Sequence, residues 1–168
     1  LSSMPFAFTY PLMKRFTYWP QLFLGITFNY GLILGWTAVK GQIDFIPILF
    51  YLGAIFWTLG YDTIYGYQDI KDDEIIGLKS TSIKFKNNPI NFLLICYLIL
   101  IIVLISLGLI MNFKYLYFIF LIVPSVHLIL FQIKKLNIND PRNCLKIFKS
   151  NNFLGLLIFI NILIGKLN

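Results

Sequence analysis

Long apolar runs constrain the fold of this chain more than any other feature. About 20 apolar residues in a helix, at a rise of about 1.5 Å each, cross a hydrocarbon core of about 30 Å. The sequence therefore predicts an all-α, multi-span transmembrane helical bundle. The expected spans are Trp19–Val39, Ile43–Gly60, Ile90–Met111, Phe113–Ile133 and a last helix that begins near Cys144 and continues through Phe153–Leu167.

Composition agrees with a membrane protein and argues against a nucleic-acid-binding one. Hydrophobic residues make up 58% of the chain and charged residues 12%, whereas an ordinary soluble domain has about 25% charged residues. The net charge is +7, but the basic residues are spread over short loops between apolar spans. Cys96 and Cys144 are far apart in sequence and environment, so we expect buried apolar side chains rather than a disulfide or metal site.

The N-terminal segment predicts an incomplete first span. Leu1–Met13 is apolar and ends at Lys14 and Arg15, and no signal-peptide pattern can be assembled from it. We expect it to be the tail of an earlier helix. On this interpretation residues 1–168 form a single, N-terminally truncated transmembrane domain of five complete spans plus part of a sixth.

The distribution of basic residues predicts the orientation of the bundle. Eleven of the 14 Lys and Arg residues lie in loops on one side, and three lie on the other. Because basic loops stay on the side of synthesis, we expect the first side to face the cytoplasm of a bacterial inner membrane, or the matrix of a mitochondrion. The three residues of the opposite side are Lys40, Lys114 and Lys166.

One polar segment, Tyr61–Ser80, interrupts the apolar chain on the basic side. It contains five of the seven acidic residues: Asp62, Asp69, Asp72, Asp73 and Glu74. If the preceding helix continued through it, Asp62 and Asp69 would lie about 20° apart, and Asp73 about 40° further round. Three or four carboxylates, with Tyr65, would then share one helix face.

Carboxylates at that spacing favour a magnesium site. Like charges repel unless a cation lies between them, and Mg²⁺ typically binds one or two carboxylates together with substrate phosphate oxygens. Lys71, Lys79 and Lys84 follow closely and could bind the rest of an anionic group. The alternative from residue types alone is a solvated charged loop between two membrane helices.

Four features inside the spans predict packing rather than chemistry. Gly31 and Gly35 form a small-xxx-small pair that permits a close helix approach, and Asn29 must find a partner inside the bundle. Pro124 is expected to kink its helix, and we interpret the nearby His127 as a packing residue.

Three stretches resemble the UbiA superfamily of intramembrane prenyltransferases, and within it the 4-hydroxybenzoate polyprenyltransferase branch. Tyr61–Phe85 (YDTIYGYQDIKDDEIIGLKSTSIKF) resembles the second aspartate-rich motif of that branch. Tyr10–Gly25 (YPLMKRFTYWPQLFLG) resembles the entry to its fifth helix, and Cys144–Phe159 (CLKIFKSNNFLGLLIF) resembles its last helix. The three occur in the family's order and together span nearly the whole chain.

The resemblance implies the C-terminal part of a nine-helix bundle that joins a polyprenyl diphosphate to the ring of 4-hydroxybenzoate in ubiquinone biosynthesis. It implies that carboxylates hold Mg²⁺ against the diphosphate and that Tyr65 lies near the reacting ends. Arg15 would face the aromatic carboxylate, Lys79 and Lys71 would bind diphosphate, and Asn151 and Asn152 would line the cavity. The implied metal ligands are Asp62, Asp69, Asp72 and Asp73, with Asp62 and Asp69 taken as catalytic.

The chain departs from the family pattern at one point. The first aspartate-rich motif is absent upstream of Tyr61, where Asp44 is the one acidic residue. We therefore expect the isolated chain to be inactive and to need a separate N-terminal half. Two alternatives stay open: a related prenyltransferase with a naphthoate, haem or chlorophyll-type acceptor, and a non-catalytic membrane protein whose carboxylates line an ion path.

Overall fold

The computed structural model describes residues 4–167, and every regular element in that range is helical. The elements in chain order are α1 (Met4–Phe16), α2 (Pro20–Asn29), α3 (Gly31–Lys40), α4 (Phe45–Gly66), α5 (Ile70–Ile76), α6 (Thr81–Lys84), α7 (Pro89–Ile110), α8 (Tyr115–Val126), the π-helical turn η1 (His127–Ile133), α9 (Pro141–Lys149) and α10 (Asn151–Leu167).

Five segments within residues 4–167 are long and apolar enough to cross a membrane. They are Pro20–Lys40, Phe45–Gly66, Pro89–Ile110, Tyr115–Ile133 and Pro141–Leu167. This confirms the all-α multi-span bundle. The boundaries differ in detail, because the second span continues six residues beyond Gly60 and the first is divided at Tyr30 into α2 and α3.

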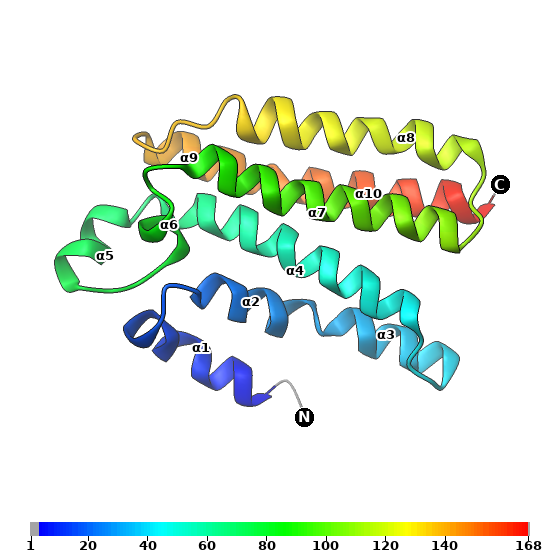
Figure 1. The fold of residues 1–168 in the computed structure, drawn as a ribbon, viewed down its shortest axis with the longest axis horizontal. Helices are drawn as coiled ribbons and strands as arrows, with labels where there is room; N and C mark the ends of the chain where they lie inside the picture. The colour runs from blue at the N-terminus through cyan, green and yellow to red at the C-terminus, as the bar shows by residue number, and fades with distance from the viewer. Residues whose placement is uncertain (1–3, 168) are drawn as a thin grey trace.

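The spans form a row of long helices with the short elements gathered at one end (Figure 1). α4 packs against α7 on one side and against α2 and α3 on the other, and α10 packs against α8. α5, α6 and α9 all lie at the end where α4 finishes. The polar segment and the basic helix α9 are therefore at the same end of the bundle.

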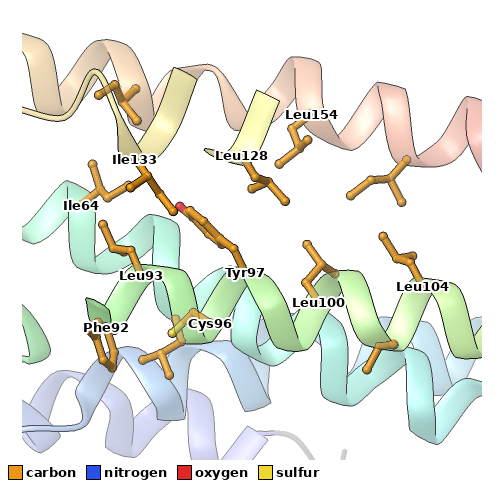
Figure 2. Close-up of a cluster of buried hydrophobic side chains, with 14 of the residues drawn as sticks. Ile64, Phe92, Leu93, Cys96, Tyr97, Leu100, Leu104, Leu128, Ile133 and Leu154 are labelled. Atoms are coloured by element: carbon orange, nitrogen blue, oxygen red, sulfur yellow. The ribbon is translucent and has the colours of Figure 1, made fainter. Parts of the chain in front are cut away.

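Glycines on α4 allow α7 to approach closely. A Cβ atom on Gly53 would lie 2.8 Å from Val103, and one on Gly60 would lie 2.6 Å from the ring of Tyr97. Leu93, Tyr97 and Leu100 of α7 then face the opposite layer, where η1 and α10 contribute Leu128 and Leu154 (Figure 2). Small residues are used in this way where helices pack inside a bilayer.

The predicted small-xxx-small contact at Gly31 and Gly35 is wrong for the described residues. A Cβ atom on either glycine would meet nothing within 4 Å. In contrast, Asn29 has the hydrogen-bond partners that a polar side chain within a membrane span requires. Its Nδ2 lies 2.7 Å from Thr58 Oγ1, 2.8 Å from the carbonyl of Gly25 and 3.2 Å from that of Ala54.

Pro124 is followed by a change of helix type rather than an end of the span. Proline lacks a backbone N–H, which disturbs the hydrogen-bond ladder of a helix, and the wider π-helical turn begins three residues later at His127. The His127 ring stacks on Phe131 with centroids 5.1 Å apart, which agrees with a packing role.

We predict that Gly60→Leu destabilises the protein and that Gly35→Leu does not. The added side chain at Gly60 overlaps the Tyr97 ring, which costs about 1–3 kcal/mol of unfolding free energy as in other overpacked cores. The same change at Gly35 enters open space. Denaturant titration in detergent micelles measures both, and an equal loss in the two variants would contradict the packing described here.

Candidate functional site

The polar segment does not continue α4 as one helix. α4 ends at Gly66, a turn follows, and α5 begins at Ile70. The predicted continuous stripe of carboxylates is therefore wrong. Tyr67, the residue after α4, is 1% exposed in the core, so the chain turns inward at this point. Burial raises the pKa of the Tyr67 phenol, so this group stays protonated.

The break distributes the four predicted metal ligands over two helices and a turn. Asp62 lies in the last turns of α4 and is partly buried, whereas Asp69 and Asp72 are exposed. Asp73 is 7% exposed and lies in the first turn of α5. Among the described residues, no three acidic, histidine or cysteine side chains are grouped closely enough to hold a metal ion.

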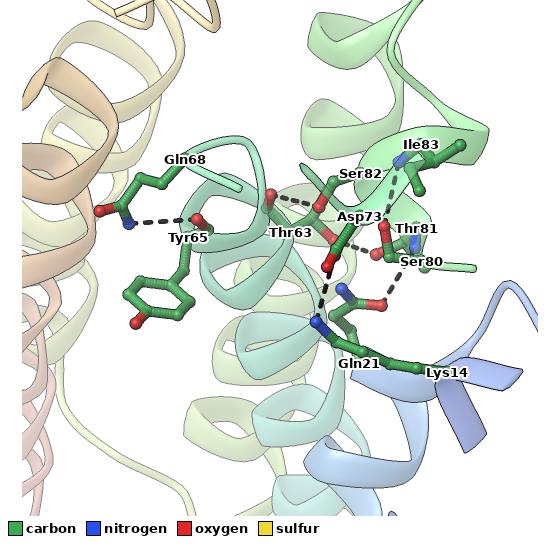
Figure 3. A network of polar contacts seen from close by, with 10 residues as sticks. All are labelled: Lys14, Gln21, Thr63, Tyr65, Gln68, Asp73, Ser80, Thr81, Ser82 and Ile83. Atoms are coloured by element: carbon green, nitrogen blue, oxygen red, sulfur yellow. Dashed lines mark hydrogen bonds and ion pairs between the residues drawn. The ribbon is translucent and has the colours of Figure 1, made fainter. Parts of the chain in front are cut away.

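Asp73 joins α5 to α1. Its Oδ2 accepts a hydrogen bond of 3.2 Å from Lys14 Nζ, and the backbone N–H of Lys79 donates to the Lys14 carbonyl at 2.7 Å. Figure 3 shows Lys14 reaching from its helix toward Asp73. Because the Asp73 carboxylate is mostly buried and already paired, Lys14 is a counter-ion for one of the predicted metal ligands.

A second set of buried polar contacts fixes α6 against the end of α4 (Figure 3). Thr63 Oγ1 lies 2.6 Å from Thr81 Oγ1, and Ser82 Oγ donates to the Thr63 carbonyl at 2.8 Å. Gln21 Oε1 accepts from the backbone N–H of Thr81 at 3.0 Å. These contacts satisfy polar groups that would be costly to bury unpaired, and they hold the segment after α5 in place.

The predicted cationic ligands lie on exposed or half-exposed positions at this end. Lys79 lies over the ring of Tyr18 at 5.7 Å, and Lys84 lies over the ring of Trp19 at 4.4 Å. Lys71 and Arg15 are exposed. None of these four takes part in the two ion pairs found in the part of the chain that the structure describes.

A pocket of about 410 Å³ opens beside the last turns of α4. Its lining residues come from α2, α4, α9 and α10: Phe28, Asn29, Trp57, Thr58, Tyr61, Phe148, Lys149, Asn151, Asn152 and Gly155. Phe148 contacts Tyr61 and Tyr65 with ring centroids 5.8 and 4.7 Å away. The structure therefore places Tyr65 against Phe148, next to the pocket.

Asn151 lines the pocket, and its side-chain atoms are hydrogen-bonded to neighbouring helical elements. Its Oδ1 accepts from Trp57 Nε1 at 2.8 Å and from Gln132 Nε2 at 2.9 Å, and Nδ2 donates to the Phe148 carbonyl at 3.0 Å. Tyr97 donates to Gln132 Oε1. Asn151 thus connects three other helical elements, whereas Asn152 is exposed.

Sequence reasoning missed Trp57, Gln132 and Tyr97. Each has a polar atom within an apolar span, which in a membrane requires a partner. That signal was present for all three, as it was for Asn29. The sequence could not show which partners these side chains have, because the hydrogen bonds join residues that are 19, 35 and 94 positions apart.

We predict that Asn151→Leu weakens the bundle and that the neighbouring Asn152→Leu leaves it unchanged. Loss of the Asn151 amide leaves the Trp57 and Gln132 donors unpaired, at about 1–3 kcal/mol for each buried group. Thermal unfolding in nanodiscs measures the effect, and a red shift of tryptophan emission should accompany it. Equal stability of the two variants would show that the hydrogen bonds do not hold the helices together.

Comparison with known proteins gives the family. The model of the UbiA prenyltransferase family matches residues 1–162. The mitochondrial 4-hydroxybenzoate polyprenyltransferase of Bos taurus is 46% identical over 95% of this chain and 43% of its own length. The Homo sapiens protein of the same name is 42% identical over 98% of the chain and 44% of its own length.

A plant relative has a related name. The 4-hydroxybenzoate geranyltransferase 2 of Lithospermum erythrorhizon is 41% identical over 98% of this chain and 54% of its own length. The chain thus spans about half the length of these curated relatives. No solved structure gave a significant match. With a family model that covers almost the whole chain, and the multi-span fold that agrees with it, this chain belongs to the UbiA prenyltransferase family.

Proposed function

We propose that this chain is part of a Mg²⁺-dependent enzyme that transfers a polyprenyl group from polyprenyl diphosphate to the ring of 4-hydroxybenzoate in ubiquinone biosynthesis. The observation that carries the proposal is identity of 41–46% over nearly all of the chain to relatives named for this acceptor. The polyprenyltransferases and the geranyltransferases differ in the donor but have the same acceptor in their names, which favours 4-hydroxybenzoate over the other acceptors considered.

The acidic residues fit a metal ion that is held jointly with substrate. Mg²⁺ takes oxygen ligands and is commonly bound by one or two carboxylates, with phosphate oxygens and waters completing the octahedron. A cluster of three protein ligands is therefore not required. Asp62, Asp69 and Asp72 carry carboxylates without an ion pair among the described residues, whereas Asp73 pairs with Lys14. The first three are therefore the first candidates, with Asp73 as the other.

The proposed chemistry divides between the polar segment and the pocket. When bound, Mg²⁺ would offset the negative charge that grows on the departing pyrophosphate. Lys79 and Lys71 would bind diphosphate oxygens beside it. Tyr61, Tyr65 and Phe148 form an aromatic wall that would exclude water from the allylic group until the acceptor ring attacks.

The enzyme would act at an inner membrane, with the polar segment facing the bacterial cytoplasm or the mitochondrial matrix. The basic loops support this orientation, and the mitochondrial names of several relatives make that membrane the alternative to a bacterial one. The polyprenyl chain would lie among the apolar helices or in the bilayer, as its length requires.

Full activity would need more than these 168 residues. The chain covers about two fifths of the length of the animal relatives, and the first aspartate-rich motif that the resemblance implies has no counterpart upstream of Tyr61. We propose that further acidic ligands come from a separate N-terminal half of the same enzyme.

The test is a chimera in which this chain replaces the matching region of the human relative. We predict prenyl transfer to 4-hydroxybenzoate that is lost with EDTA and restored by Mg²⁺. Asp62→Asn or Asp69→Asn should lower kcat at least 100-fold, because the neutral amide binds the cation far less well. Radiolabelled 4-hydroxybenzoate incorporation measures each variant.

Two controls accompany the chimera. Glu74→Gln alters an acidic residue of the same segment that pairs with Lys86 at the surface, and it should retain activity. The isolated 168-residue chain should give no transfer. Full activity of Asp62→Asn and Asp69→Asn together, or activity that persists in EDTA, would refute the metal assignment.

A further inference from the structure

A groove of about 490 Å³ lies on the outside of the bundle, between α7 and the span formed by α8 and η1. Nine residues line it: two from α7, five from α8 and two from η1. It shares none of them with the 410 Å³ pocket beside the end of α4. Ile122, Val126 and Leu130 of its lining are exposed at the surface of the bundle, so in a membrane the groove faces lipid.

The lining presents apolar surface to an occupant. Ser125 is the one lining residue with a polar side chain, and its Oγ already donates to the Leu121 carbonyl of the same helix at 2.8 Å. The lining extends from Phe118 to Leu130, which is about 18 Å at a rise of about 1.5 Å per residue. One leaflet is about half of a hydrocarbon core of about 30 Å. The groove is therefore long enough to hold one acyl chain along the depth of a leaflet.

Two lysines lie at one end of the groove. Lys134 follows Leu130 by four positions, about one helical turn, and its backbone N–H donates to the Ile129 carbonyl at 3.1 Å, so the helix continues to it. The next residue, Lys135, lies over the ring of Phe131 at 5.0 Å. Both lysines are exposed, and neither belongs to the two ion pairs found in residues 4–167.

The helix that follows this pair is basic as well. α9 places Arg142, Lys146 and Lys149 on one face, because positions i, i+4 and i+7 lie on the same side of a helix, and all three are exposed. Asp140 is the one acidic residue after Glu74 in the sequence, and it caps α9 by accepting from the Arg142 backbone N–H at 3.0 Å. Positive charge thus prevails over the stretch from Lys134 to Lys149.

We propose that the groove binds an anionic phospholipid, with one acyl chain between α7 and α8 and the phosphate paired with Lys134 and Lys135. Anionic headgroups attract basic residues at the membrane surface. A zwitterionic phospholipid can place its chain in the same groove, but its ammonium group is repelled by the two lysines, so the site prefers a headgroup with a net negative charge. Such a site requires only the membrane-spanning fold and is independent of the proposed function.

The opposite end of the groove is the weaker candidate for the headgroup. Lys114 precedes Phe118 by about one turn there and is also exposed. It is a single lysine, whereas Lys134 and Lys135 are neighbours, and each further cation adds to the attraction of an anionic lipid. Lys114 is therefore a matched control for Lys134.

The test is native mass spectrometry of the 168-residue chain in detergent, titrated with phosphatidylglycerol or phosphatidylcholine, which gives the Kd of the first bound lipid. Phosphatidylglycerol should bind about tenfold more tightly or better. Lys134→Gln should weaken phosphatidylglycerol binding about fivefold, as expected for the loss of one cation near an anionic headgroup, and leave phosphatidylcholine binding unchanged. Lys114→Gln should change neither.

A second pair of variants tests the groove itself. Ile122 and Ile119 are both exposed on α8, but Ile122 lines the groove and Ile119 does not. Ile122→Trp should weaken the binding of both lipids by a similar factor, because the larger side chain occupies the space of the acyl chain. Ile119→Trp should leave both unchanged. Circular dichroism of each variant checks that the helices are intact.

Equal affinity of the unmodified chain for the two lipids would overturn the inference, and so would equal effects of Lys134→Gln and Lys114→Gln. Equal effects of Ile122→Trp and Ile119→Trp would show that the lipid lies outside the groove, which also overturns it. None of these results bears on prenyl transfer by the chimera, so the lipid site and the proposed function can fail separately.

Discussion

The need to satisfy polar groups at the end of α4 determines how the candidate site is arranged. In an apolar environment an unpaired hydroxyl or amide is costly, and the chain meets this requirement by folding α6 back onto α4. The contacts of Thr63 with Thr81 and Ser82, and of Gln21 with the Thr81 backbone, fix that position. The turn between α4 and α5 separates Asp62 from Asp72 and Asp73.

The sequence predicted the spans because apolar length is a local property of the chain. It could not predict the shape of the polar segment, because the burial of Tyr67 and the pairing of Asp73 with Lys14 are tertiary events. A helical wheel assumes that the helix continues, and here it ends at Gly66. For the same reason the sequence did not predict that Gly35 is exposed. It did predict that Asn29 needs a hydrogen-bond partner, because that need follows from the position of a polar residue within an apolar span.

At the pocket, too, the sequence predicted local features but not tertiary contacts. The resemblance predicted that Asn151 lines a cavity, but the sequence could not show its hydrogen bonds with Trp57 and Gln132, because these residues lie far from it along the chain. These hydrogen bonds tie α4, η1 and α10 together, so the polar atoms that shape the pocket wall also hold the bundle. Trp57 and Asn151 therefore both line the pocket and hold the helices together.

The proposed metal site is tested most directly by measuring whether a divalent cation at the polar segment is bound both by its carboxylates and by the diphosphate. Mn²⁺ substituted into the chimera reports this by electron–nuclear double resonance with bound polyprenyl diphosphate. We expect a strong ³¹P coupling that shows direct coordination, and its loss in the Asp62→Asn variant. A Mn²⁺ signal that shows no ³¹P coupling, or a coupling that survives replacement of both Asp62 and Asp69, would contradict it.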